Sequence, residues 1–240
     1  MIVTEIIPHT LSSADAASAD GRRLLTEAYT RTEPSYVRLN MITSVTGSAA
    51  GDDGTSETLT NRVDRMILGI IRRDADVVLV GAQSVRAEGY VVPRSARLAI
   101  VTTSGDLSGH RLTLEPGAAA DQVLLVCPAD RAAELAARTS IHGVQVVAVA
   151  GGPHLAPAAI IEALAERDLR RVVCEGGPGL ASQFAEAGVI DEYCVTVAPV
   201  IEQADAPFLR VGHDSRPVTD VAGMVVDGSG FSYLRLRRRT

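Results

Sequence analysis

The sequence lacks the charge pattern of a protein that binds nucleic acid. Its 240 residues include 29 acidic and 23 basic side chains, which give a formal net charge of −6, and the basic residues are spread along the chain without forming a stripe. Nucleic acid backbones and anionic membranes attract clustered lysine and arginine. We therefore expect neither nucleic acid nor a membrane surface as a partner.

A long apolar run is also missing. No stretch reaches the roughly 18 apolar residues of a membrane span, and the N-terminus has no charged segment followed by a continuous apolar one. These absences favour a cytoplasmic protein. With 46% hydrophobic residues, the chain is long enough to bury the core of one large domain.

The patterns of disulfide and metal sites are absent as well. Cys127, Cys174 and Cys194 are far apart and lie in apolar runs, which is typical of buried thiols. The five histidines stand apart from other ligands, and the acidic loop 52–54 lacks the spacing of a calcium-binding loop. We expect no metal.

The remaining pattern alternates short apolar runs with amphipathic ones. We interpret residues 1–34 as an N-terminal extension with one short helix after the Asp20-Gly21 turn, and residues 35–240 as the main domain. Apolar runs predict strands at 37–45, 77–81, 98–102, 123–127, 144–151, 171–175, 191–199, 218–226 and 230–237. Helices are expected over 61–75, with Thr60 as its N-cap, from 129, from 156 and over 180–188.

This alternation predicts the fold class. Short Val, Ile and Leu runs separated by helices are typical of a mainly parallel sheet that is covered on both faces. The last three predicted strands have no helices between them, so that edge of the sheet is expected to be antiparallel. The sequence therefore predicts an α/β fold with a mainly parallel central sheet, helices on both faces and an antiparallel C-terminal edge.

Three of the predicted strands end in glycine, at Gly81, at Gly151-Gly152 and at Gly176-Gly177. In open α/β sheets ligands bind beyond the carboxyl ends of the strands, where glycine lets the backbone approach a phosphate and a helix N-terminus favours its charge. A single glycine junction is equally typical of an ordinary turn, but the repetition predicts a phosphate site for a dinucleotide. No GxGxxG is present, which excludes an ordinary Rossmann fingerprint.

Three polar residues lie beside these junctions. Glu175 directly precedes the Gly176-Gly177 pair, where it is either a ligand-binding carboxylate or an acid that favours a helix N-terminus. Thr103 and Ser104 follow another predicted strand. They either hydrogen-bond the 2′-phosphate that distinguishes NADPH from NADH or form an ordinary turn. The sequence alone decides neither the role of Glu175 nor that of Thr103 and Ser104.

Five segments resemble, in order, the C-terminal reductase domain of bacterial riboflavin-biosynthesis deaminase-reductases. They are VRLNMITSVTG, DVVLVGAQSVRAEGY, RLAIVTTS, VAVAGGP and VVCEGGPGLASQFAEAGVIDEYCVTVAPVI, and the resemblance runs from about residue 36 to the end. The chain is also similar to stand-alone pyrimidine-reductase-like proteins of actinobacteria, because the HxE…PCxxC deaminase signature is missing. The resemblance implies a dihydrofolate-reductase-like fold and a homodimeric, NADPH-dependent reductase of a ribosylaminopyrimidine 5′-phosphate.

The resemblance also implies roles for individual residues. On the cofactor side, the matching positions are Gly81, Ala82, Ser84 and Val85 at the nicotinamide and ribose, Thr103 and Ser104 at the 2′-phosphate, and Gly151, Gly152, Gly176, Gly177 and Pro178 at the pyrophosphate. On the substrate side they are Asn40, Ser44, Thr46, Arg86, Glu88 and Glu175.

Within this set we expect hydride transfer to the ribose C1′ of an opened ribosylamine. Glu175 is the first candidate for polarising the substrate and Glu88 the second. Arg86 either pairs with the substrate phosphate or is an ordinary surface charge.

Two positions depart from the family pattern. Thr46 stands where the family usually has aspartate, and Asn40 stands where many bifunctional members have lysine. Because Thr46 cannot act as a carboxylate, two alternatives stay open. One is the reduction of dihydrofolate or another pterin. The other is an NADPH-binding protein without catalysis.

Overall fold

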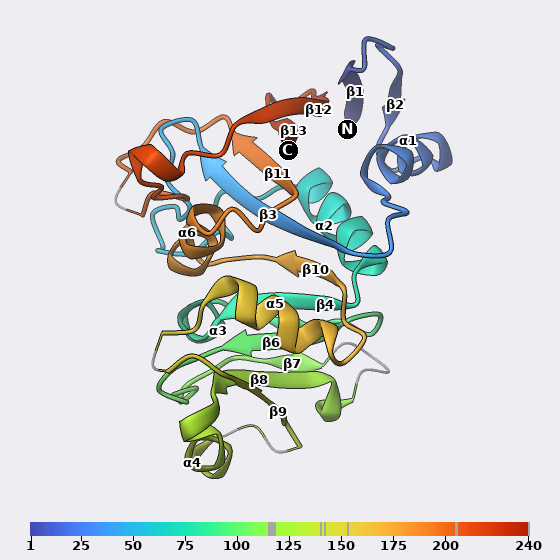
Figure 1. Cartoon of the computed structure of the whole chain (residues 1–240). Coiled ribbons are helices and arrows are strands. Elements are labelled where there is room, and N and C mark those ends of the chain that lie inside the picture. Colours follow the sequence, from blue (N-terminus) through green and yellow to red (C-terminus); the bar gives the residue numbers. More distant parts are fainter. Residues whose placement is uncertain (115–118, 140, 142, 153, 205, 240) are drawn as a thin grey trace.

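The computed structural model of the chain describes residues 1–114, 119–139, 141, 143–152, 154–204 and 206–239. Over these residues the chain forms an 11-stranded sheet and a separate pair of short strands (Figure 1). The strand order of the large sheet is β2-β1-β12-β13-β11-β3-β10-β4-β6-β8-β9. The expected α/β fold class is confirmed.

The centre of the sheet is parallel, as predicted. Its strands are β3 (Tyr36–Ser44), β4 (Val77–Gly81), β6 (Arg97–Val101), β8 (Val123–Pro128), β9 (Gln145–Val149), β10 (Arg171–Cys174) and β11 (Glu192–Ala198). Each pairs in parallel with its neighbours in the order β11-β3-β10-β4-β6-β8-β9. Their carboxyl ends therefore lie along one edge of the sheet.

The antiparallel edge is larger than the sequence predicted. The two expected strands, β12 (Thr219–Asp227) and β13 (Ser232–Arg238), pair antiparallel with each other, and β13 pairs antiparallel with β11. Two further strands, β1 (Ile2–Ile7) and β2 (Ser13–Asp15), extend this edge, with β1 antiparallel to β12. The separate pair is β5 (Val91–Val92) with β7 (Thr113–Leu114).

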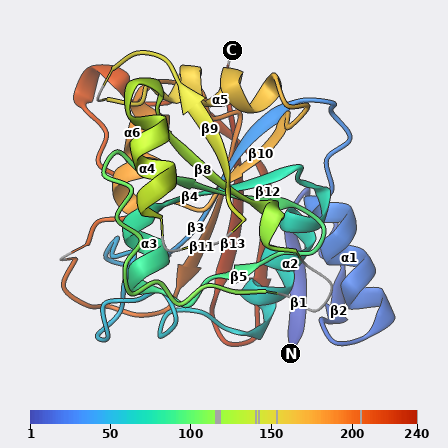
Figure 2. The ribbon, with the colours of Figure 1, turned by 90° about the horizontal axis from the view of Figure 1, so that it is seen from below.

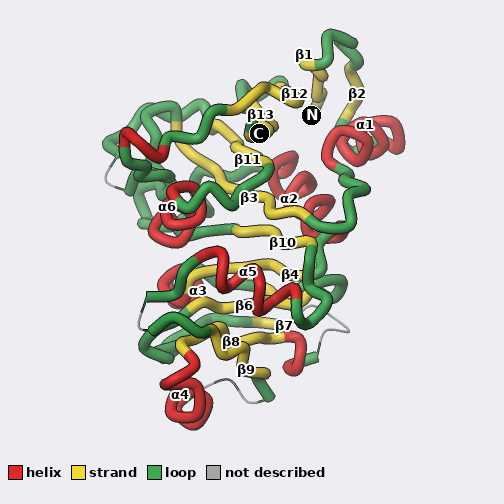
Figure 3. The backbone as a smooth tube through the Cα atoms, viewed as in Figure 1, coloured by secondary structure: helices red, strands yellow, loops and turns green. Residues whose placement is uncertain are grey.

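Helices cover both faces of the sheet (Figure 2). The helices α1 (Ala19–Tyr29), α2 (Arg62–Asp74), α3 (Ala82–Ala87) and α4 (Ala132–Arg138) contribute to one apolar cluster. The other cluster includes α5 (Pro157–Ala165) and α6 (Pro178–Glu186). Short 3-10 turns occupy Ala120–Gln122, Ala129–Arg131 and His213–Ser215. Figure 3 shows the same alternation of helix and strand along the backbone.

Two predicted helix starts are wrong by a few residues. Asp20 and Gly21 lie inside α1, which is capped by the Ser18 side chain. Asn61, not Thr60, caps α2, because its side-chain oxygen accepts a hydrogen bond of 2.9 Å from the Asp64 amide. Both Thr60 and Asn61 are residue types that cap helices, so the pattern alone does not choose between them.

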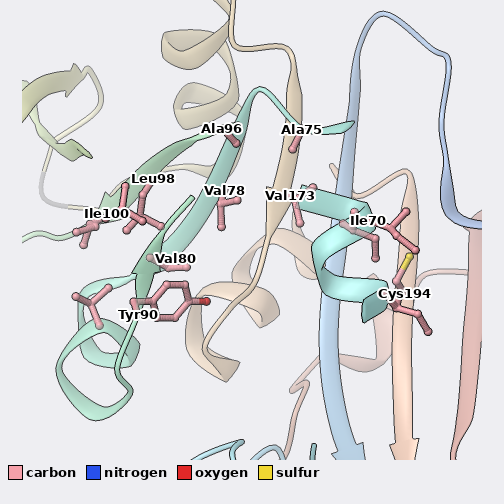
Figure 4. Packing of buried hydrophobic residues seen from close by; sticks show 14 of the residues in the cluster. Ile70, Ala75, Val78, Val80, Tyr90, Ala96, Leu98, Ile100, Val173 and Cys194 are labelled. Atoms are coloured by element: carbon pink, nitrogen blue, oxygen red, sulfur yellow. The ribbon is translucent and has the colours of Figure 1, made fainter. Parts of the chain in front are cut away.

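The buried face of α2 fixes that helix against the centre of the sheet. Ile67, Ile70 and Ile71 are buried with Val78 of β4 and Val173 of β10, part of which Figure 4 shows. The last turn of α2 lies near the amino end of β4, which follows it in the chain, whereas α3 and α6 begin at the carboxyl ends of β4 and β10 (Figure 1).

Candidate active site at the strand ends

Two of the predicted glycine junctions are bonded directly to each other. The Gly81 amide donates to the Gly176 carbonyl at 2.8 Å, and the Gly177 amide donates to Ser84 Oγ at 2.7 Å. The first junction leads from β4 into α3, and the second leads from β10 into α6. The structure thus brings Gly81, Ser84, Gly176 and Gly177 together.

The second junction accepts only glycine at two positions. Gly176 has φ +82°, in the left-handed region, and a Cβ there would lie 3.0 Å from Sδ of Met41. A Cβ at Gly177 would lie 2.7 Å from Oγ of Ser84. The Gly176–Gly177 peptide is cis. Pro178 follows as the first residue of α6, which is a position that proline favours.

The other predicted cofactor residues are more scattered. Ala82 and Val85 of α3 are buried in the core, so only their backbone is available to a ligand. Gly151 and Gly152 follow β9. In the sheet, the strands β4, β6 and β8 lie between β10 and β9. Both have positive φ, and no atom lies within 4 Å of a Cβ built there. Pro153 of this segment lies outside the described residues.

Thr103 and Ser104 lie at the end of β6, and both are exposed. The Thr103 carbonyl accepts a hydrogen bond of 2.6 Å from Nη1 of Arg131, and Ser104 Oγ accepts one of 3.2 Å from the Asp106 amide. The sequence reasoning missed Arg131, whose Nε and Nη2 bind the Glu134 carboxylate while Nη1 binds the Thr103 carbonyl.

Glu175 is held by two other side chains. Arg72 of α2 donates to both of its oxygens at 2.7 Å, and Tyr90 Oη donates to Oε2 at 2.6 Å. The Glu175 side chain is only 5% exposed. Burial, together with the Glu175 charge, raises the pKa of Tyr90 well above its usual value, so Tyr90 remains a donor. Glu175 therefore joins α2, the end of β10 and the segment after α3.

This arrangement changes the chemistry available to Glu175. Both oxygens of Glu175 already accept hydrogen bonds, from a guanidinium fork and from a phenol. They can still orient a donor of the substrate through their remaining lone pairs. This bonding suits an orienting role for Glu175.

Asp64 is the carboxyl group that the sequence reasoning missed. It lies in the first turn of α2, and its two oxygens accept hydrogen bonds of 2.6 Å from Thr60 and from Thr196 of β11. Burial raises the pKa of Asp64 above its usual value, against the effect of these two hydroxyl donors, and the charge of Glu175 adds to the rise. The region thus holds two carboxyl groups in different environments.

The predicted substrate residues of β3 have different surroundings. Asn40 points to the α2 face of the sheet in register with Cys194, and among the described residues its amide has no hydrogen-bond partner. Ser44 Oγ lies 3.0 Å from Thr46 Oγ1 and accepts from the Ser48 amide at 3.0 Å. Thr46 Oγ1 donates to the Glu202 carbonyl at 2.6 Å. Thr46 therefore joins two loops at the strand ends.

Glu88 and Arg86 bind neighbouring loops. Glu88 accepts hydrogen bonds from the Ser56 amide at 3.3 Å and from its hydroxyl at 3.1 Å. Arg86 is half-buried and donates to the Asp106 carbonyl at 2.5 Å. Glu88 thus holds the loop that follows β3, and Arg86 has the surroundings of a surface residue, one of its two interpretations.

The sequence of the chain matches the model of one known protein family. A family model described as the RibD C-terminal domain matches residues 35–220. The chain belongs to the RibD C-terminal domain family. The resemblance inferred from the five sequence segments is confirmed.

Known members of the RibD family are distant from this chain in sequence. The RibD protein of Mycobacterium tuberculosis H37Rv is 30% identical over 171 residues, which are 71% of this chain and 44% of that protein. The chain spans about half the length of the RibD relatives it matches. A protein of Methanothermobacter thermautotrophicus, named 2,5-diamino-6-ribosylamino-4(3H)-pyrimidinone 5′-phosphate reductase, is 25% identical over 199 residues, covering 79% of this chain and 85% of that protein.

Solved structures show the same RibD-type fold. A pyrimidine reductase-like protein from Corynebacterium diphtheriae superimposes with a TM-score of 0.71 at 19% identity, covering 90% of this chain and 98% of that one. The name of the Methanothermobacter relative makes it a reductase of a small molecule.

The cysteines of this RibD-family chain have the surroundings that the sequence indicated. The three cysteines are free and buried, and burial raises the pKa of Cys174 and of Cys194 to about 12. Within the described ranges, no group of three or more potential ligands is arranged to hold a metal ion. No helix in that part of the chain has the length and apolar character needed to cross a membrane.

We predict that Arg72→Met destabilises the protein by about 3–5 kcal/mol, because it leaves the buried Glu175 carboxylate without its counter-charge. Urea unfolding followed by circular dichroism measures the loss. Arg73→Met is the matched control, since Arg73 is the exposed next residue of the same helix, and we expect it to change the free energy of unfolding by less than about 0.5 kcal/mol. Equal stability of the two variants would contradict the assignment.

Proposed function

We propose that this chain is an NADPH-dependent reductase of a ribosylaminopyrimidine 5′-phosphate, of the kind used in riboflavin biosynthesis. The proposal rests on one observation above all. The β4–α3 and β10–α6 junctions are bonded to each other at the strand ends, beside the Asn40, Glu175 and Asp64 side chains. A cofactor at these junctions lies next to groups that bind a polar substrate.

The residues at the junctions fit a dinucleotide. Gly177 carries no side chain that would keep a ligand away from this turn, and its own amide is bonded to Ser84 Oγ. The turn of Gly151 and Gly152 is open and suits a more distant part of the same ligand. The exposed hydroxyl groups of Thr103 and Ser104 can donate to a 2′-phosphate, which favours NADPH over NADH.

The chemistry divides between the cofactor and the chain. Bound NADPH supplies the hydride for the ribose C1′ of the substrate. The chain aligns the acceptor through the Asn40 amide and the Glu175 carboxylate, and it donates the proton that the substrate needs. Asp64 holds a proton at higher pH than an ordinary aspartate does. We therefore assign the proton-donor role to Asp64 and an orienting role to Glu175.

Asp64 also favours a second candidate, the reduction of a pterin. Each Asp64 oxygen accepts one hydroxyl and keeps a free lone pair. Two parallel acceptors suit the neighbouring N–H donors of a 2-aminopyrimidinone ring, which pterins contain. The same ring is present in the diaminopyrimidinone named for the Methanothermobacter relative.

A homodimer in the cytoplasm completes the proposal. Val45 and Ile201 are 58% and 82% exposed. The Val45 amide donates to the carbonyl of Val200, the residue that precedes Ile201. Such adjoining exposed apolar side chains are typical of protein interfaces. Free buried cysteines agree with a reducing compartment.

The proposed activity predicts that NADPH is consumed when the deaminated ribosylaminopyrimidine phosphate is added to the purified protein. The loss of absorbance of the reduced nicotinamide measures the rate, and a parallel assay with dihydrofolate tests the pterin candidate. Faster turnover of dihydrofolate would replace the first candidate by the second. Tight binding of NADPH without turnover of either substrate would favour a protein that has lost catalysis.

For the cofactor site we predict that Gly177→Val weakens NADPH binding by about tenfold or more, because the new side chain displaces Ser84 and covers the backbone. Titration of the nicotinamide fluorescence measures the affinity. Gly179→Val is the matched control, since a Cβ at Gly179 has no atom within 4 Å. Unchanged affinity in the Gly177 variant would remove the phosphate site from this junction.

For the proton donor we predict that Asp64→Asn lowers turnover by about 10²-fold. In the wild type, turnover should fall as the pH rises through the raised pKa of Asp64, because the acid form is lost; in the variant this dependence should disappear. Asp52→Asn, an exposed acid of the loop after β3, controls for the loss of charge. Wild-type turnover and an unchanged pH profile in Asp64→Asn would exclude the role.

A further inference from the structure

A row of alternating charges crosses the sheet near the amino ends of the parallel strands, opposite to the candidate active site. Arg38 of β3 is paired in register with Glu192 of β11, and Glu192 with Arg237 of β13. Arg237 is paired in turn with Asp220 of β12. The basic residues are spread along the sequence, but the fold gathers several of them here.

Cations outnumber the carboxylate at the centre of this row. Glu192 is fully buried, and its oxygens lie 2.6 Å from Arg38 Nη2, 2.9 Å from Arg235 Nη2, 3.5 Å from Arg237 Nε and 3.8 Å from Arg31 Nη1. Of these four arginines, Arg31 also binds Glu33. Among the described residues, Arg31 Nη1 and Arg235 Nε are buried donors without a hydrogen-bond partner. The cluster therefore has an excess of positive charge and of donors.

This excess faces a hollow of about 800 Å³ on the surface, between α1 and the ends of β12 and β13. Its lining consists of Glu27, Thr30, Asp220, Ala222, Arg235, Arg237, Arg238 and Arg239. Because side chains alternate along a strand, Arg235, Arg237 and Arg239 point to one face. Arg235 is 12% exposed, whereas Arg237 and Arg239 are 50% and 60% exposed.

The two exposed arginines differ in how their donors are used. Arg239 binds Asp220 through Nε at 2.7 Å and through Nη2. Arg237 has only the 3.5 Å contact of its Nε with Glu192 among the described residues, so its two terminal amino groups are available. The two acidic residues that line the hollow are already paired with arginines. Asp220 binds Arg239, and Glu27 lies 3.9 Å from Arg23.

We propose that this hollow binds a small molecule that carries a diphosphate group. Guanidinium forks match phosphate oxygens in geometry, and an anion here offsets the buried positive charge around Glu192. Alternate residues of a strand are about 6.8 Å apart, so Arg237 and Arg239 reach different oxygens of one diphosphate. A volume of this size holds a nucleotide as well as inorganic pyrophosphate.

Isothermal titration of the full chain tests the proposal at about 150 mM salt, where weak surface attraction is screened. The ligands are inorganic pyrophosphate and ADP, each added after the protein has been saturated with NADP⁺ so that the strand-end site is blocked. We expect pyrophosphate to bind with a dissociation constant below about 1 mM. If ADP binds more tightly than pyrophosphate, the nucleoside is also recognised, which would support the proposal.

Variants of Arg237 locate the binding. Arg237→Gln should weaken pyrophosphate binding by about tenfold or more, and Arg237→Lys by less, because lysine keeps the charge but loses the fork. Arg65→Gln is the matched control, since Arg65 is equally exposed on α2 and pairs with Glu57. NADPH turnover and the melting temperature without ligand should stay unchanged in Arg237→Gln. Absence of pyrophosphate binding to the wild type, or equal binding to Arg237→Gln, would overturn the proposal.

Discussion

The contact of Glu175 with Arg72 and Tyr90 is the interaction on which the site depends. It joins the last turn of α2 and the segment after α3 to the end of β10, and Glu175 is 103 residues from Arg72 and 85 residues from Tyr90. The Gly176 carbonyl and the Gly177 amide, which bind the neighbouring junction, follow Glu175 directly. Fixing this one carboxylate therefore fixes where two strand ends meet, and a ligand site can form only where their backbone positions are constant.

The central sheet was predictable because its strands are buried on both faces. A strand such as Val77–Gly81 has apolar side chains on both sides, so it stands out as a continuous run. The edge strands β1 and β2 are only partly buried, with polar residues among apolar ones, and they were missed. The strand β12, with which β1 pairs, lies more than 200 residues away, so no local pattern indicates this pairing.

The candidate site was predictable in its backbone and not in its side chains. Gly81, Gly176 and Gly177 are visible in the sequence because a turn or a close approach requires glycine locally. Arg72 and Asp64 lie in α2 and look like the polar face of an amphipathic helix. Their partners Glu175 and Thr196 are 103 and 132 residues away, so only the fold reveals them. Asp64, which we propose as the proton donor, was missed in the sequence for this reason.

The two clusters of charge lie at opposite ends of the parallel strands. Toward the carboxyl ends, two carboxyl groups have different partners: a cation for Glu175 and hydroxyl groups for Asp64. At the amino ends, one carboxylate is shared by several guanidinium groups. A buried carboxylate among cations keeps a low pKa despite its burial, as Glu192 does, whereas one among hydroxyl groups is raised, as Asp64 is. The same residue types thus give a proton-holding site at one end of the strands and an anion-attracting surface at the other.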